Sequence, residues 1–425
     1  MTDFVTLDDL DFAGLVKPGD LVVCGQGSGE PVDLTARLMT QRSRIGGRFR
    51  LFLGVGVAGT FAPEQADHVH FMGYGALGTN SKLGAAGVLD AVPTHYSQLQ
   101  RMFAEGWQKA DVALLLLSPA DAQGRHHTGL NHDYLFDAAR SARLVIAEIN
   151  ENVPRTPGAE LPPDIGVHLA VRTTRAMPEL KAGVPNDIER RLAANVAAEV
   201  PEGATIELGV GTVPELVLGA LGGHRRLGVH SGVVSDGMVD LIRSGAIDNS
   251  AKREDAGITI GGLLLGSRKL FDFADGNAAL RLCPPVHTHG IEVLARLPRF
   301  TAINAALEVD LTGQINSEMA GTQIGALGGQ VDFSRGGMAS TGGRSIIALQ
   351  ATARKGAVNR IVAKLPDATV TTPRSDADVV VTEWGVAHLR GKSLGQRARA
   401  LAAIAEPRFR EELERASAAL VKSGA

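Results

Sequence analysis

The sequence predicts an α/β protein made of two similar tandem domains with mostly parallel sheets, which we place at residues 1–184 and 185–425. Three observations support this fold class. The chain has 425 residues, 44% of them hydrophobic, and is long enough to bury two cores. Its 51 glycines, against three tyrosines, indicate many tight turns between strands and helices. A strand, glycine turn and helix near the start also return about 180 residues later.

Composition argues against several classes of function. The formal charge is −3 and there is no basic run, so nothing favours nucleic acid. No apolar run reaches the roughly 18 residues that a membrane span needs, and acidic residues interrupt residues 1–16, unlike a signal peptide. We therefore expect a cytoplasmic protein that is not bound to a membrane. Cys24 and Cys283 lie in apolar surroundings, and two buried thiols are favoured over a disulfide.

The first half begins with a β-branched apolar strand at residues 20–24. A glycine turn then leads into a helical pattern over residues 32–39, with Pro31 suited to the first helical turn. Further strands are predicted at residues 49–53, 68–72, 112–117 and 144–148. Residues 154–185 carry six prolines and predict a crossover, within which residues 167–171 could form one strand.

The second half opens with a helix over residues 188–200, capped by Asn186 and Asp187. Residues 203–208 then form a strand, followed by a glycine turn and a helix starting near residue 215, so GATIELGVGTVPELVLGAL repeats the pattern of GDLVVCGQGSGEPVDLTARL. Later strands are predicted at residues 227–229, 258–260, 301–303 with 309, 345–349, 360–362, 369–371 and 379–381. Charged helices from Ser393 and Glu406 close the chain.

A glycine-rich stretch between two apolar runs, at residues 301–349, predicts the site around which the rest is organised. It holds eight glycines between Gly321 and Gly343. A glycine loop lets main-chain N–H groups approach a ligand without a Cβ in the way. Arg335 and Arg344 would supply charge for an anionic ligand.

Two glycine turns, at residues 25–29 and 209–211, each follow a strand and precede a helix. Such a turn presents N–H groups and the positive end of the helix dipole to an anion. Neither completes a dinucleotide fingerprint, because the first has the wrong spacing and the second has Pro214 in place of the third glycine. The alternative for each turn is that glycine simply allows close packing of helix on sheet.

The histidines do not predict a metal site. Three of them lie with two aspartates in a loop-like stretch: His126, His127, His132, Asp121 and Asp133. No cysteine or second acid stands there at ligand spacing. His287 and His289 share one face, where they could line a substrate pocket or face solvent, and the same alternatives hold for His95.

Several long motifs resemble the acetyl-CoA hydrolase/4-hydroxybutyrate CoA-transferase family of class I CoA-transferases: INAALEVDLTGQIN, GGQVDFSRG, GGRSIIA and VVTEWGVAHLRGK. In the first half, GQGSGEP, FMGYGALGTN, LSPAD and GLNHDY look most like the itaconate CoA-transferase branch. The resemblance implies two CoA-transferase-type domains with the active site in the cleft between them. It also implies acyl-CoA and small carboxylate substrates, coenzyme A as co-substrate without a tightly bound cofactor, and a homo-oligomer.

The family chemistry implies roles for several residues. A glutamate attacks the acyl-CoA thioester, and the resulting anhydride and glutamyl-CoA thioester pass CoA to a second carboxylate. The resemblance implies that Gly328 and Gly329 donate N–H groups to the oxyanions, and that Gly209 and Gly211 face CoA. Arg344, where many relatives have lysine, would pair with a phosphate.

One departure from the family pattern concerns the nucleophile. Gly232, in His230-Ser231-Gly232, stands where the family has its glutamate, and glycine has no carboxylate. Another carboxylate could substitute, with Glu64 as first choice and Glu30 as second, whereas Glu308 is favoured as structural. Alternatively, CoA passes directly between bound substrates, or the chain hydrolyses acyl-CoA, or it binds CoA esters without catalysis.

Overall fold

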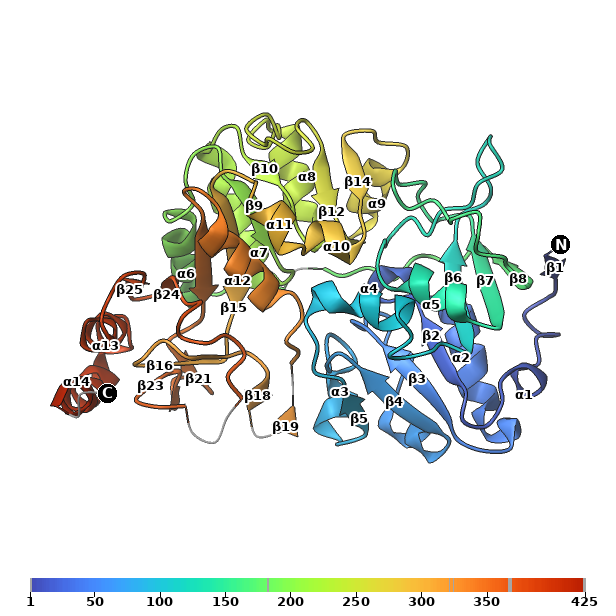
Figure 1. Cartoon of the computed structure of the whole chain (residues 1–425), viewed down its shortest axis with the longest axis horizontal. Helices are drawn as coiled ribbons and strands as arrows, with labels where there is room; N and C mark the ends of the chain where they lie inside the picture. The colour runs from blue at the N-terminus through green and yellow to red at the C-terminus, as the bar shows by residue number, and fades with distance from the viewer. Residues whose placement is uncertain (1, 182, 321, 324, 366–368, 423–425) are drawn as a thin grey trace.

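The computed structural model describes residues 2–181, 183–320, 322–323, 325–365 and 369–422. Two large sheets, one from each half of the chain, lie side by side (Figure 1). The first is entirely parallel, in the order β1 (Asp3–Phe4), β8 (Leu169–Thr173), β7 (Leu144–Asn150), β6 (Val112–Leu117), β2 (Leu21–Cys24), β3 (Phe49–Leu53), β4 (Val69–Gly73) and β5 (Leu89–Ala91). The second has the order β10 (Gly228–Val229), β9 (Thr205–Leu208), β15 (Phe300–Ala305), β20 (Arg344–Ala348), β24 (Val379–Thr382) and β25 (Gly385–His388), with only the last pair antiparallel.

The predicted repeat is visible in the topology. Strands β2 and β9 have equivalent neighbours: the next strand of the chain on one side (β3 or β10) and a strand reached by a crossover on the other (β6 or β15). The α/β fold with mostly parallel sheets is therefore confirmed. The strands of the two sheets fall on either side of residue 184, although the exact boundary between the domains remains a prediction.

The helices of the described residues are α1 (Phe12–Leu15), α2 (Val32–Gln41), α3 (Ser81–Ala85), α4 (Tyr96–Ala104), α5 (Leu135–Ser141), α6 (Asp187–Ala197), α7 (Thr212–Ala220), α8 (Asp236–Arg243), α9 (Arg268–Ala274), α10 (Pro285–Thr288), α11 (Ile291–Leu294), α12 (Gln330–Ala339), α13 (Leu394–Ala403) and α14 (Pro407–Lys422). No helix in the described residues is long and apolar enough to cross a membrane. Figure 1 shows α4 and α10 near the junction of the two halves, and their residues are in contact.

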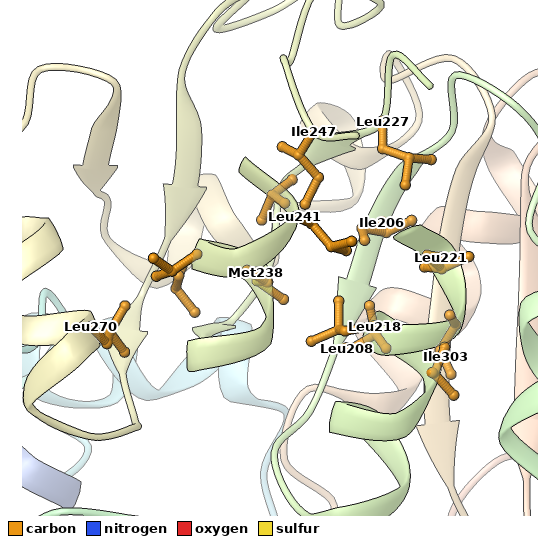
Figure 2. Packing of buried hydrophobic residues seen from close by; sticks show 14 of the residues in the cluster. Ile206, Leu208, Leu218, Leu221, Leu227, Met238, Leu241, Ile247, Leu270 and Ile303 are labelled. Atoms are coloured by element: carbon orange, nitrogen blue, oxygen red, sulfur yellow. The ribbon is translucent and has the colours of Figure 1, made fainter. Parts of the chain in front are cut away.

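Side chains along β9 alternate between the two faces of its sheet. Ile206 and Leu208 pack into a core with α7 and α8, which Figure 2 shows from close by. On the other face of this sheet, Ala302 of β15 packs with Phe333 of α12. Because successive side chains of a strand point to opposite faces, the residue between Ile206 and Leu208 is directed toward the α12 side.

Short strands complete the second half: β11 (Val233–Val234) with β13 (Leu263–Leu264), β12 (Thr259–Gly261) with β14 (Leu280–Leu282), β16 (Glu308–Asp310) between β17 (Ile315–Asn316) and β23 (Ile361–Val362), β18 (Met319–Ala320) with β19 (Thr322–Gln323), and β21 (Thr352–Ala353) with β22 (Val358–Asn359). The prediction of a strand at residues 369–371 is wrong, because none of these residues is in a strand; the next residue, Thr372, makes an isolated bridge with Ile315. Cys24 and Cys283 are both buried and free, as predicted.

The glycine-rich stretch is only partly a loop. Its second part is helix α12, which contains Gly336 and Gly337. A Cβ on Gly337 would lie 2.2 Å from the carbonyl oxygen of Arg344, and one on Gly336 would lie 2.7 Å from Leu294. These glycines therefore permit close packing of α12 rather than access to a ligand. Gly321 lies outside the described residues.

Candidate active site

A cavity of about 450 Å³ lies between the two halves of the chain. Its lining includes Gly209, Gly211, Gly328 and Gly329, so the structure brings together the four glycines that the sequence nominates. The first half contributes Tyr74, Tyr96 and residues 55–57. Gly209 and Gly211 follow β9, and Gly328 and Gly329 precede α12, so the cavity opens at strand and helix ends where main-chain N–H groups are available.

Contacts from the first half hold the turn before α12. Tyr96 N donates to the Gly328 carbonyl oxygen at 2.9 Å. Ser97 N and Oγ donate to the Asp332 carboxylate at 3.1 and 2.8 Å. Neither Gly328 N nor Gly329 N donates a hydrogen bond to any described residue. The turn is thus fixed through its carbonyl and its helix, while its N–H groups are left for a ligand.

The two predicted glycine turns differ in how much room they leave. In the first turn, a Cβ on Gly25 would lie 2.2 Å from the Gly29 carbonyl oxygen, and one on Gly27 would lie 2.5 Å from Leu265. In the second turn, a Cβ on Gly209 or Gly211 would meet nothing within 4 Å. The first turn therefore serves close packing, and the second is open to the cavity.

The first glycine turn still shapes the cavity, through Gln26. Gln26 Nε2 donates to Tyr96 Oη at 3.0 Å and to Asp133 Oδ2 at 2.7 Å. Gln26 Oε1 accepts from Tyr74 Oη at 2.7 Å and from Val55 N at 3.1 Å. Because three of these partners line the cavity, this buried amide fixes the wall contributed by the first half.

The carboxylates that sequence reasoning nominated lie outside this lining. Glu64 is exposed on a short 3₁₀ helix, Pro63–Asp67. Glu30 is buried, and Thr35 Oγ1 donates to its Oε1 at 2.8 Å. Burial raises the pKa of the Glu30 carboxyl, and hydrogen bonds from Thr60 and Thr35 oppose that rise.

Glu207 of β9, which sequence reasoning missed, does line the cavity and is only 3% exposed. Asn304 Nδ2 of β15 donates to Glu207 Oε2 at 2.9 Å. Burial raises the pKa of the Glu207 carboxyl to about 8, and hydrogen bonds with Asn304 and the main chain of Ile303 offset only part of that rise. The sequence signal was a single acid in an apolar strand directly before a glycine turn.

At Gly232, two neighbouring rings leave little room for a Cβ. A Cβ there would lie 3.0 Å from Cε1 and Nε2 of His289 and 3.3 Å from Phe333. The His289 ring lies between Tyr96 and Phe333, at centroid distances of 4.6 and 4.4 Å. Burial lowers the pKa of His289 to about 3, so the imidazole is neutral at physiological pH. Of the alternatives for His289, the structure supports lining of the cavity.

The structure does not bring Arg335 or Arg344 to the cavity. Arg335 pairs with Asp376 at 2.8 Å. Arg344 forms an ion pair with Glu199 and begins β20, where it is in register with Thr301 of β15. Asn304, which lines the cavity, lies three residues further along β15, or about 10 Å toward the carboxyl edge of the sheet.

One group of described side chains has the composition of a metal site: His230, Asp255 and His287, whose ligand atoms lie within 4.8 Å of one another. The buried Lys252 ammonium lies close by and donates to Val229 O and Ile258 O. Burial and the charge of Lys252 lower the pKa of His230 to about 3. A cation bound there would be repelled by this ammonium.

The histidines of the loop at residues 126–132 contact other protein groups. His126 contacts Ser118 O, His127 contacts the Asp121 carboxylate, and His132 contacts Gly158 O.

Comparison with known proteins identifies the family. Models of the acetyl-CoA hydrolase/transferase N-terminal and C-terminal domains match residues 7–177 and 266–417. The chain is 38% identical to the 4-hydroxybutyrate coenzyme A transferase of Clostridium kluyveri, over 92% of each chain. It is 32% identical to the succinyl-CoA:cyclohexane-1-carboxylate CoA transferase of Geobacter metallireducens, over 96% of this chain and 94% of that protein. The crystal structure of RipA from Yersinia pestis superposes with a TM-score of 0.91 at 32% identity, covering 98% of this chain and 97% of the other. The chain therefore belongs to the acetyl-CoA hydrolase/transferase family of CoA-transferase enzymes, for which coenzyme A is a co-substrate.

Proposed function

We propose that this protein moves CoA from succinyl-CoA or a short acyl-CoA to a small carboxylate, with itaconate as the acceptor that the first-half motifs favour. The observation that carries the proposal is the cavity between the halves. Gly328 and Gly329 leave their N–H groups without a partner among the described residues, and Gly209, Gly211 and Gly328 leave open space for a thioester. Preorganised N–H donors stabilise an oxyanion, and removing one typically costs about 2.7–4 kcal/mol of barrier.

A second class of acceptor is favoured by the lining of the cavity. The described lining residues include no lysine or arginine, and several of them are aliphatic, among them Val55, Leu77, Val233, Leu263 and Leu265. An apolar monocarboxylate would bury its body against such a wall, whereas a dicarboxylate would bring a second charge that needs a partner. We therefore include butyrate and cyclohexane-1-carboxylate as candidate acceptors beside itaconate.

The test incubates the protein with succinyl-CoA, with and without each acceptor, and follows the CoA esters by mass spectrometry. Acceptor-dependent formation of the new CoA ester supports transfer, and the relative rates assign the acceptor class. Free CoA released equally without acceptor would support hydrolysis instead. Tight binding of succinyl-CoA with neither product would show a CoA-ester binder and contradict the proposal. A cytoplasmic location and a homo-oligomeric state remain expectations from the sequence.

A further inference from the structure

We propose that Glu207 is the nucleophile of the transfer reaction and replaces the glutamate that the family motif places at position 232. The inference rests on the proposed function and adds the residue that carries it out. Glu207 is buried in β9 and is the only carboxylate among the described residues that line the cavity. Glu64 and Glu30 are not among the lining residues, so neither is as well placed as Glu207 to attack a thioester held at Gly328 and Gly329.

The strand geometry directs Glu207 to the side of the sheet where the oxyanion donors lie. Ile206 and Leu208 face the α7 core, so Glu207 faces the opposite side. Its register partner in β15 is Ala302, which packs with Phe333 of α12. The turn at Gly328–Gly329 begins α12, so the carboxylate and the unused N–H groups share one face and one cavity.

The contacts of Glu207 are too few to account for a glutamate there as a stabilising residue. Asn304 is its only side-chain hydrogen-bond donor in the described part of the chain, and no lysine, arginine or histidine described here forms an ion pair with it. A buried carboxylate with so few partners is costly, and an apolar residue of similar size would be less so. Such a group is typical of a functional site, where a side chain is kept for its chemistry.

Position 232 shows the complementary change. Strand β9 is the parallel neighbour of β10, with Val229 opposite Ile206, and Gly232 follows β10 by three residues. The built Cβ at Gly232 approaches Phe333 and His289, so this position faces the same side as Glu207. A carboxylate is thus missing after one strand and present on the adjacent strand, and the His289 ring packs closely against the position where the missing side chain would begin.

The reaction balances with Glu207 in this role. Glu207 first loses its proton to water, and a carboxylate oxygen then attacks the acyl carbonyl carbon. The C–S bond breaks and CoA leaves as a thiolate, giving a glutamyl–acyl anhydride. The thiolate attacks the glutamyl carbonyl carbon and expels the donor carboxylate, giving a glutamyl-CoA thioester. The acceptor carboxylate attacks this thioester and expels the thiolate again. The thiolate then attacks the acceptor's carbonyl carbon, which yields the new acyl-CoA and regenerates Glu207.

The decisive experiment traps the thioester on the wild-type protein. Protein, succinyl-CoA and sodium borohydride are mixed, and peptide mass spectrometry locates the glutamate that is reduced to an alcohol; a sample without succinyl-CoA is the control. We expect the reduced residue to be Glu207. Reduction at Glu64, Glu30 or another glutamate would overturn the inference. Transfer by the wild type with no reduced residue would also overturn it, while leaving the proposed function intact. No transfer at all would overturn both.

Variants provide a second, independent readout. Glu207→Gln keeps the shape of the side chain, and we expect it to lower kcat for transfer by at least about 1000-fold while CoA binding changes little. Glu207→Asp withdraws the carboxylate by one methylene, and a displacement of about 1 Å can cost on the order of 100-fold. The matched control is Glu308→Gln, a glutamate outside the cavity that accepts a similar bond from Asn316 at 3.1 Å and should keep kcat within about twofold. Wild-type turnover by a folded Glu207→Gln protein would refute the assignment.

Discussion

Glu207 should make the protein less stable as pH rises, and replacing it with glutamine should remove that effect. The pKa of its carboxyl is about 8 in the folded protein, against 4.5 for an ordinary glutamate. Between these values the folded state holds a proton that the unfolded chain has lost, so the free energy of unfolding falls with increasing pH. The sign is opposite to that of a carboxylate stabilised by an ion pair.

The size of the effect follows from the separation of the two pKa values. That separation corresponds to about 5 kcal/mol in full, at 1.36 kcal/mol per pH unit. Between about pH 5 and about pH 8.5, linkage predicts that about 4 kcal/mol of it is lost. Water entering the cavity beside Glu207 would reduce the measured value, so about 2–4 kcal/mol is expected.

Other groups that line the cavity should not obscure this titration. Burial lowers the pKa of His289 to about 3 and raises the pKa values of Tyr74 and Tyr96 well above that of an ordinary tyrosine. These three side chains therefore stay neutral across the range. Of the described titratable groups of the lining, Glu207 is the one that changes charge.

The assay is urea denaturation of the wild type and of Glu207→Gln at about pH 5 and about pH 8.5, with Glu308→Gln as the control. The difference between the free energies of unfolding of the two proteins cancels the contribution of every titrating group that they share. We expect Glu207→Gln to gain stability relative to the wild type by about 2–4 kcal/mol on going to the higher pH. A difference that is the same at both pH values would refute the burial argument, whether or not Glu207 is catalytic.

Two further predictions concern the glycines. Gly209→Ala should keep the free energy of unfolding within about 0.5 kcal/mol of the wild-type value, because the added methyl group meets no atom within 4 Å. It should lower kcat/KM by about 10- to 200-fold, because that methyl group enters the cavity. Gly25→Ala should instead lower the free energy of unfolding by about 1–3 kcal/mol or more, since its Cβ would lie 2.2 Å from the Gly29 carbonyl oxygen. If the two variants behaved alike in denaturation and steady-state assays, the predicted difference between the two turns would be wrong. Gly329→Ala would place a Cβ 2.6 Å from His289, and we expect calorimetry to show a loss of about 1–3 kcal/mol, whereas an unchanged melting temperature would mean that the ring moves freely.

Much of the fold could be predicted because strongly apolar strands and glycine turns are local signals. The strands at residues 49–53 and 112–117 have the predicted bounds, and the repeat correctly indicated the equivalence of β2 and β9. The prediction of a strand at residues 369–371 was wrong because a short segment with threonine and valine looks like an edge strand in the sequence. Whether such a segment joins a sheet depends on tertiary contacts that the local sequence does not show. Helix α12 was missed because glycine disfavours a helix locally, whereas its close packing on β20 requires glycine.

The lining of the candidate site could be predicted from the sequence where it consists of main chain, and much less where it consists of side chains. Gly328, Gly329, Gly209 and Gly211 were identified because glycine at a strand or helix end commonly marks a place where the main chain turns tightly or comes close to a ligand. Glu207 was passed over because a single acid in a strand gives no sign of which face it occupies. That face became evident only from the packing of its neighbours and from the hydrogen bond with Asn304, which is distant in sequence.

The charges of the cavity bear on how the substrates must lie. With no lysine or arginine among the described lining residues, an anion in the cavity is stabilised by main-chain N–H groups at two helix starts, Gly328–Gly329 before α12 and Gly209–Gly211 before α7. Without a cationic side chain to neutralise them, the fewer negative charges the cavity holds at one time, the better. A covalent route meets this condition, because Glu207 exchanges its charge with the substrate carboxylate at each step. Direct transfer would instead bring the acceptor carboxylate and the developing oxyanion together into the same apolar space, beside a protonated Glu207 that takes no part, and the surrounding aliphatic wall disfavours this arrangement.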